Sequence, residues 1–203
     1  ILPANTLSAG GYDVDNSLRF NVGSSDYLNR TVGSAGNRKT FTFSSWIKKN
    51  TLTATSVIIA QEYGDWTGSG VLTQLRMDDI GRLQFNNLSG NAYASKLATN
   101  ALNTDQSAWY HFVAVHDSSN STELDRMQLW INGVRQTDFD SPSYPALNYE
   151  SAFGTTEQDL TIGATNHGAS PANFFNGYMS EVCFIDGQAL AADSFGEFDE
   201  DSG

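Results

Sequence analysis

The sequence between residues 109 and 115 is Trp109-Tyr110-His111-Phe112-Val113-Ala114-Val115. Aromatic and β-branched side chains such as these favour extended backbone. Apolar residues at both odd and even positions are typical of a strand that is covered on both faces. This stretch therefore predicts a central strand of a β-sheet, and the rest of the chain is interpreted outward from it.

Segments on either side of this stretch alternate between apolar and polar residues. A period of two places successive side chains on opposite faces of a strand, so each segment predicts a half-buried strand. In the pair Asn132-Gly133, both residues accept the positive φ of a type I′ turn, which predicts a hairpin. Residues 78–81 predict a second, longer hairpin. The alternating segments are residues 18–22, 41–47, 82–86 and 126–132.

Helical patterns are scarce in this sequence. Residues 91–102 are compatible with a turn or two of helix, and residues 188–195 with one short helix. Many short strands with almost no helix predict a sandwich or a barrel. A chain of 203 residues suits one such domain, with a polar entry segment at residues 1–11 and an acidic tail at 197–203. Since residue 1 is Ile1, we expect the chain to be an excerpt of a longer one or a processed product.

The charge balance excludes several classes of partner. The chain has 11 basic and 23 acidic residues, a net charge of −12, which disfavours nucleic acid and anionic membranes as partners. No apolar stretch approaches the roughly 20 residues that span a bilayer. Cys183 is the one cysteine, so no intrachain disulfide forms, and its apolar surroundings predict a small buried side chain.

Several motifs, taken in order, resemble a known family. They are Ser17–Asn21 with Asp26–Leu28, Phe41–Lys48, Trp109–Val115, Leu129–Val134, Leu160–Gly163 and Phe175–Val182. Together they are similar to the strands of concanavalin A-like and laminin-G-like domains. The resemblance implies an all-β fold, a two-sheet antiparallel jelly-roll sandwich with one or two short helical turns.

A narrower resemblance concerns bacteriophage virion proteins. It rests on Arg30-Thr31, Gly36–Ser44, Phe184–Leu190 and Asp193–Asp199, which are similar to segments of structural proteins in marine tailed phages. It implies a location on the capsid or tail surface, other virion proteins as partners and a homo-oligomer within the virion.

No catalytic constellation stands out, so we predict that the chain is not an enzyme. Glycoside hydrolases of this fold carry two Glu about an Asp on one strand, where the carboxyl groups lie about 5 Å apart. Only Glu197-Phe198-Asp199-Glu200 approaches this pattern, with altered spacing and within the acidic tail. His111 and His116 differ by an odd number, so they point to opposite faces and do not share a metal. The resemblance implies a core role for His111.

Glycan binding is the leading functional hypothesis. Sugars offer apolar C–H faces to aromatic rings and hydroxyl groups to paired polar side chains. We predict a site built by loops around Trp66, which lies in a Gly-rich segment outside any alternating run. Its ligand would be a host surface polysaccharide or glycan. The predicted glycan-binding residues are Tyr63, Asp65, Trp66, Tyr93, Asn166 and His167, and Tyr144, Asn148 and Tyr149 lie on further loops that could converge with them.

Calcium is the one cofactor that the sequence suggests. Ca²⁺ prefers several oxygen ligands from loop carboxylates and carbonyls. Asp13 and Asp15 form an Asp-x-Asp-Asn segment at the start of the domain, and residues 117–125 form a second acidic loop. Such residues are also common in turns without a metal.

The rival hypothesis is a purely structural part. A sandwich offers broad sheet faces, and a domain of this kind could decorate a capsid or pack into a fibre without recognising any sugar. The sequence leaves this alternative open.

Overall fold

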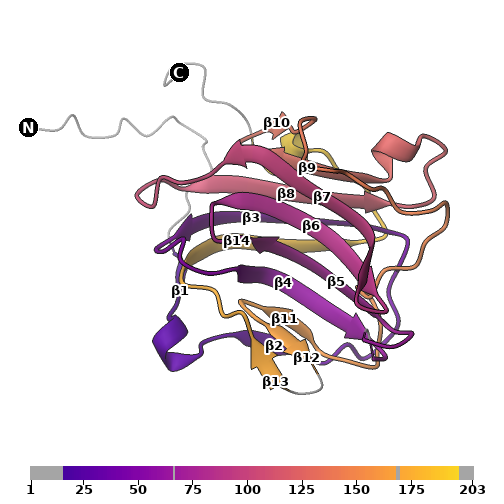
Figure 1. The fold of residues 1–203 in the computed structure, drawn as a ribbon, viewed down its shortest axis with the longest axis horizontal. Coiled ribbons are helices and arrows are strands. Elements are labelled where there is room, and N and C mark those ends of the chain that lie inside the picture. Colours follow the sequence, from indigo (N-terminus) through magenta and orange to yellow (C-terminus); the bar gives the residue numbers. More distant parts are fainter. Residues whose placement is uncertain (1–15, 66, 168–169, 197–203) are drawn as a thin grey trace, which may run out of the picture.

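A computed structural model describes residues 16–65, 67–167 and 170–196 as a sandwich of two antiparallel β-sheets (Figure 1). Sheet A has the strand order β1-β14-β3-β8-β9-β10, and sheet B has the order β2-β11-β4-β5-β6-β7. The predicted all-β, two-sheet antiparallel sandwich is confirmed. Among the described residues, no helix is long and apolar enough to span a bilayer.

The strands have the following bounds. Sheet A contains β1 (Leu18–Phe20), β3 (Thr40–Lys49), β8 (Tyr110–Asp117), β9 (Met127–Ile131), β10 (Val134–Arg135) and β14 (Gly177–Asp186). Sheet B contains β2 (Leu28–Arg30), β4 (Ser56–Tyr63), β5 (Val71–Met77), β6 (Arg82–Ser89), β7 (Ala92–Leu102) and β11 (Leu160–Ile162). A small hairpin pairs β12 (Thr165–His167) with β13 (Ser170–Ala172), and three 3-10 turns are η1 (Val22–Ser24), η2 (Glu123–Asp125) and η3 (Ala192–Ser194).

The core fills the space between the sheets and follows the period of two. Phe43 of β3 and Phe112 of β8 point inward from sheet A, and Leu75 and Phe85 point inward from β5 and β6 of sheet B. All four side chains are almost completely buried. The predicted strand at residues 109–115 is β8, which lies between β3 and β9 in sheet A.

Both predicted hairpins are present. Asn132 and Gly133 have φ of 48° and 75°, the left-handed conformation that a type I′ turn requires. At the second hairpin, Asp78 accepts hydrogen bonds from the backbone N–H groups of Ile80 and Arg82, and Gly81 has φ of 95°.

The helical turns expected at residues 91–102 are wrong, because this segment is strand β7. Its small and polar residues carry little local preference, and pairing along the whole length of β6 determines its conformation. The short helix expected at residues 188–195 is confirmed as η3. Cys183 is half-buried rather than fully buried, because it lies opposite Ser44 on the outer face of sheet A, while the next residue, Phe184, packs against the core.

Candidate functional site

The side chains of β4 to β7 that point away from the core form the candidate site, which we call the outer face of sheet B. Figure 1 looks onto sheet B, with strands of sheet A behind it. Leu75 and Phe85 point inward, so the residues on either side of each along β5 and β6 point outward. The outer face comprises Val57, Ala60 and Glu62 of β4, Leu72, Gln74 and Arg76 of β5, Gln84, Asn86 and Leu88 of β6, and Tyr93, Lys96 and Ala98 of β7.

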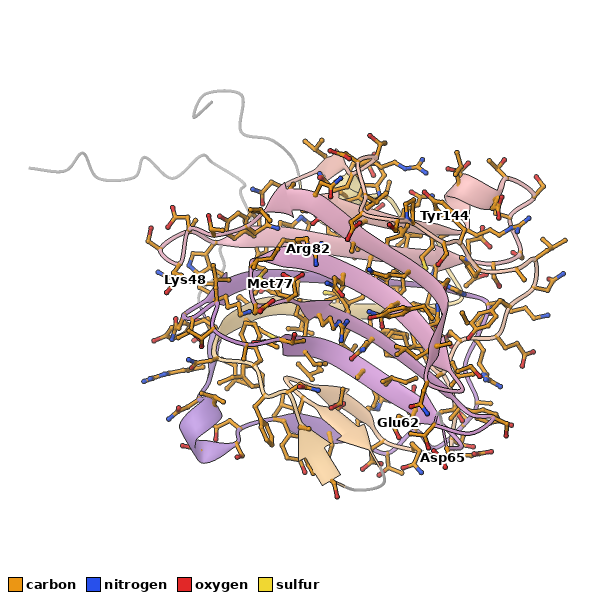
Figure 2. The ribbon with its side chains drawn as sticks, viewed as in Figure 1. Lys48, Glu62, Asp65, Met77, Arg82 and Tyr144 are labelled. Carbon is orange, nitrogen blue, oxygen red and sulfur yellow. The ribbon has the colours of Figure 1, made fainter. Side chains whose placement is uncertain are left out.

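Part of this face is apolar and part is rich in amides and cations. Val57, Ala60 and Leu72 pack together with Leu88. The polar part lies beside them on β5, β6 and β7. Glu62 lies toward one end of these strands and Arg82 toward the other (Figure 2). At its own end, Arg82 pairs with the carboxylates of Asp78 and Asp140.

Arg76 organises the polar part. Its Nε and Nη2 donate to the side-chain oxygen of Gln84 at 3.0 and 2.9 Å, and Nη2 also donates to the Tyr93 hydroxyl at 2.8 Å. The Lys96 Nζ lies 5.3 Å from the centroid of the Tyr93 ring. Tyr93 is nonetheless 45% exposed, so much of its ring remains open to solvent.

Asn86 lies at the centre of this polar part. Its cross-strand neighbours are Gln74 on β5 and Lys96 on β7. The side chain is fully buried, and neither Oδ1 nor Nδ2 has a hydrogen-bond partner among the described residues. A buried amide without partners costs about 1–3 kcal/mol, so its presence at a strand centre requires an explanation.

The register of the strands explains why Asn86 is covered. Arg76 is opposite Gln84, and Tyr93 is opposite Leu88. The hydrogen bond between Arg76 and Tyr93 therefore runs diagonally from β5 to β7. On β6 this diagonal passes midway between Gln84 and Leu88, which is the position of Asn86. The Arg76–Tyr93 bond thus bridges the unpartnered amide.

The structure places the predicted loop residues in different surroundings. Tyr93 lies on the outer face of sheet B, whereas Tyr63 points to the opposite side of the sheet, where the guanidinium of Arg38 lies 4.2 Å from the centroid of its ring. Asp65 lies in the turn after β4 and accepts hydrogen bonds from the backbone N–H and the hydroxyl of Thr67. The structure therefore does not bring Tyr63 and Tyr93 together.

The turn after β4 is held close to that strand. A Cβ atom on Gly70 would lie 2.3 Å from the backbone oxygen of Tyr63, so only glycine fits there. Asn91 donates to the backbone oxygen of Thr67 at 3.1 Å, which ties this turn to the β6–β7 hairpin.

Other predicted residues lie elsewhere or outside the described residues. Asn166 and His167 belong to β12, which pairs with β13. Tyr149 packs against His116 with ring centroids 6.5 Å apart, and burial raises its pKa to about 12. Tyr144 packs against the core. Trp66, Asp13 and Asp15, together with Glu197 and Glu200, lie outside the described residues.

The second acidic loop suggested for calcium is engaged in other contacts. Asp125 pairs with Arg135 at 2.6 Å, and Asp117 accepts a hydrogen bond from Ser119 at 2.5 Å. Within the described part of the chain, no three His, Cys, Asp or Glu side chains gather as a metal site. Calcium at Asp13 and Asp15 stays a prediction.

The two histidines of β8 point to opposite faces, as the alternation predicted. His111 lies on the outer face of sheet A, where it bonds to the Ser44 hydroxyl at 2.8 Å and stacks on Trp46 at 5.0 Å. His116 is the one that enters the core, fully buried against Phe41. His111 is thus buried and hydrogen-bonded, as a satisfied structural histidine would be, but it lies outside the space between the sheets.

The tryptophans outside the predicted loop lie along sheet A. Trp46 and Trp109 are 36% and 38% exposed, so neither is a core residue. Trp130 points outward as well, and Phe195 and Ala192 of the C-terminal segment cover it.

Sequence reasoning missed most of the outer face of sheet B. The predicted site was placed on loops with exposed aromatic residues. The residues it missed belong to strands, and they are Gln74, Arg76, Gln84 and Asn86. The available signal was the alternation itself, because polar residues at every second position of β5 and β6 mark one face. Within that alternation, Asn86 is the residue most informative about binding, because it is an amide in the middle of a strand with the amides of Gln74 and Gln84 beside it.

Comparisons with known proteins concern nearly the whole chain. The profile of the family described as Concanavalin A-like lectin/glucanases superfamily matches residues 12–194. A comparison with curated proteins gives no significant match.

Solved structures of similar fold come from several organisms. A heptameric SAP-like pentraxin from Limulus polyphemus is 16% identical with a TM-score of 0.59, covering 89% of this chain and 80% of its own. Domains LG4-5 of the mouse laminin α1 chain are 17% identical with a TM-score of 0.59, covering 90% and 44%. The CBM40 of a Ruminococcus gnavus IT-sialidase, solved with α2,3-sialyllactose, is 13% identical with a TM-score of 0.55, covering 84% and 95%. At these identities the likeness concerns the fold.

Proposed function

We propose that this chain, which belongs to the Concanavalin A-like lectin/glucanases superfamily, binds carbohydrate through the outer face of sheet B. The observation that carries the proposal is the Asn86 amide, which is buried on that face with neither atom hydrogen-bonded to a described residue. A sugar hydroxyl both donates and accepts, so it satisfies an amide that lacks both partners. The cost of the unpartnered amide is then recovered on binding.

The surroundings of Asn86 suit a sugar. Gln74 is its neighbour on β5, and Gln84 lies two residues away on β6. Planar amides at fixed strand positions provide the donors and acceptors that orient hydroxyl groups. Tyr93 is exposed enough for its ring to take the C–H face of a pyranose. Since the Arg76–Tyr93 bond bridges Asn86, a ligand that reaches the amide displaces this bond.

We propose binding without catalysis. Glycoside hydrolysis by the usual route needs two carboxyl groups about the scissile bond. Among the residues that define the outer face of sheet B, Glu62 is the one carboxylate, and it is almost fully buried. This supports a lectin-like role. One similar structure, the CBM40, was solved with a bound sugar, which agrees with a binding module of this fold.

The setting proposed for this binding is a phage virion, where the domain attaches to a host glycan. This part rests on the sequence segments at residues 36–44 and 184–190, which are similar to those of marine tailed-phage proteins. A purely structural role in the virion is the competing proposal. It draws support from the exposed aromatic side chains Trp46 and Trp109 on sheet A.

Two neighbouring asparagines on β6 provide the test. Asn86 points outward, whereas Asn87 points inward and is hydrogen-bonded to Thr73 and Ser95. We expect Asn86→Ala to abolish binding to a glycan array and to change the free energy of unfolding by less than about 1 kcal/mol. Asn87→Ala should cost about 1–3 kcal/mol and leave binding intact, because it removes partners from two buried hydroxyl groups.

Two results contradict the proposal. One is the absence of binding by the wild-type chain to any arrayed glycan, including host-derived polysaccharides, which favours the structural role. The other is binding that Asn86→Ala leaves unchanged, which places the sugar elsewhere on the molecule.

A further inference from the structure

Two cations, Arg76 and Lys96, lie on the outer face of sheet B. If that face binds carbohydrate, as proposed above, they indicate whether the sugar is charged or neutral. Arg76 donates to a neutral amide oxygen of Gln84 and a neutral hydroxyl of Tyr93, and Lys96 contacts the Tyr93 ring. Within the described residues neither cation has a carboxylate partner. Arg76 and Lys96 therefore have no direct counter-ion.

Acidic residues outnumber basic ones in this chain by 23 to 11, so carboxylates are abundant. Three other arginines do pair with carboxylates. Arg38 pairs with Glu150, Arg135 with Asp125, and Arg82 with both Asp78 and Asp140. The other cations of the described residues, Arg76 and Lys96 among them, form no ion pair. These two differ from the rest in lying beside the unpartnered Asn86 amide.

Two carboxylates lie on this face or at its edge, Glu62 and Asp78. Asp78 accepts a hydrogen bond from the Gln84 amide that Arg76 also contacts, and its charge is paired with Arg82 at 2.7 Å. Glu62 is opposite Leu72, which precedes Arg76 by four residues, about 13 Å along β5. Lys96 is on β7, three strands from β4, which is about 14 Å. At these separations Glu62 does not neutralise either cation.

We infer that the sugar carries an anionic group, held between Arg76 and Lys96 beside the Asn86 amide. The bonds to Gln84 and Tyr93 use Nε and Nη2 of Arg76. Among the described residues the two N–H groups of Nη1 have no acceptor, so they can donate to an acid oxygen. The ammonium of Lys96 offers three more donors, and Asn86 Nδ2 offers two. Charge-assisted hydrogen bonds of this kind are about twice as strong as neutral ones. Carboxylate and sulfate share this chemistry.

Matched pairs of glycans test the inference and separate the two sources of charge. Polygalacturonate is compared with its methyl ester, and dextran sulfate with dextran, each by titration calorimetry at low and at moderate salt. We expect at least one anionic member to bind roughly tenfold more tightly than its neutral partner. We also expect that preference to weaken as salt increases. Non-specific attraction does not explain such a preference, because the chain has a net charge of −12.

Two lysine variants remove the same charge from different places. Lys96→Gln acts on the outer face of sheet B, and Lys48→Gln acts on β3 of sheet A. We expect Lys96→Gln to lose the preference for the anionic glycan by roughly tenfold, while Lys48→Gln keeps it. Arg76→Gln should have a similar effect to Lys96→Gln, and the urea midpoint of each variant verifies its fold.

The outcomes distinguish this inference from the proposed function. Equal affinity for charged and neutral members, with binding still lost in Asn86→Ala, overturns the anionic sugar and leaves carbohydrate binding in place. A preference that Lys96→Gln and Lys48→Gln reduce alike also overturns it, because the effect is then one of net charge. Absence of binding to every glycan overturns both.

Discussion

His116 is a buried base, and its environment predicts how the stability of the fold depends on pH. The imidazole is fully buried and stacks on Phe41 with ring centroids 5.0 Å apart and an interplanar angle of 12°. Phe85 approaches edge-on at 6.3 Å. Burial lowers the pKa of His116 from 6.5 to about 4, although the Tyr149 backbone and the Asp117 charge oppose the shift. The native state therefore holds this imidazole neutral.

The sign and size of the effect follow from that shift. Below pH 6.5 the unfolded chain binds a proton at His116, while the native chain does not bind one until about pH 4. The unfolded state then binds more protons, so stability falls as the pH decreases through this window. At about 1.36 kcal/mol for each pH unit, the loss at pH 5 is about 2 kcal/mol relative to neutral pH.

Urea unfolding at pH 7.5 and pH 5.0 tests this prediction with His116→Phe as the reference. Phenylalanine keeps the stacked ring and removes the titrating group, so we expect the wild type to lose about 2 kcal/mol more than the variant between the two pH values. The pKa of His111 is also lowered by burial, and its contribution appears in both proteins and cancels. His116→Leu is a second reference variant, in case the phenylalanine ring is too large for the space that the imidazole fills. An equal loss in wild type and both variants would refute the reasoning.

Two further predictions concern stability, each with its control. Gly177→Ala should cost about 1–3 kcal/mol, because its Cβ would lie 2.1 Å from a backbone oxygen of β3. Gly196→Ala, with nothing within 4 Å, should change the unfolding free energy by less than about 0.5 kcal/mol. Arg82→Ala should cost about 1–3 kcal/mol, because Asp78 is 5% exposed and loses a 2.7 Å partner. Arg135→Ala, at a half-exposed ion pair, should cost less than about 1 kcal/mol. Urea midpoints measure all four; equal effects within either pair would contradict the packing or the burial argument.

Much of the fold could be predicted from the sequence because it depends on local rules. A period of two determines which residues share a face, and it predicted β3, β6 and β9, while the continuous apolar run predicted β8. Asn132 and Gly133 tolerate positive φ, so their hairpin needed no tertiary contact. Residues 91–102 failed because local preference there is weak, and β6 imposed the strand by pairing.

The candidate site was less predictable, because it is made by neighbours on different strands. Tyr93 was identified from its residue type, but Tyr63 points to the other side of sheet B. Asn86 gains its meaning only from the register, which places it between Gln74 and Lys96. Register depends on hairpin lengths and bulges, such as the one between Asn87 and Leu88.

Strand β8 shows which properties the sequence determined and which the tertiary structure decided. Alternation by itself determined that His111 and His116 point to opposite faces of one strand. Only the tertiary structure decided that His116 enters the core and His111 stacks on Trp46. The physical reason is that both faces of β8 are apolar, so a period of two orders the side chains without saying which face meets the other sheet.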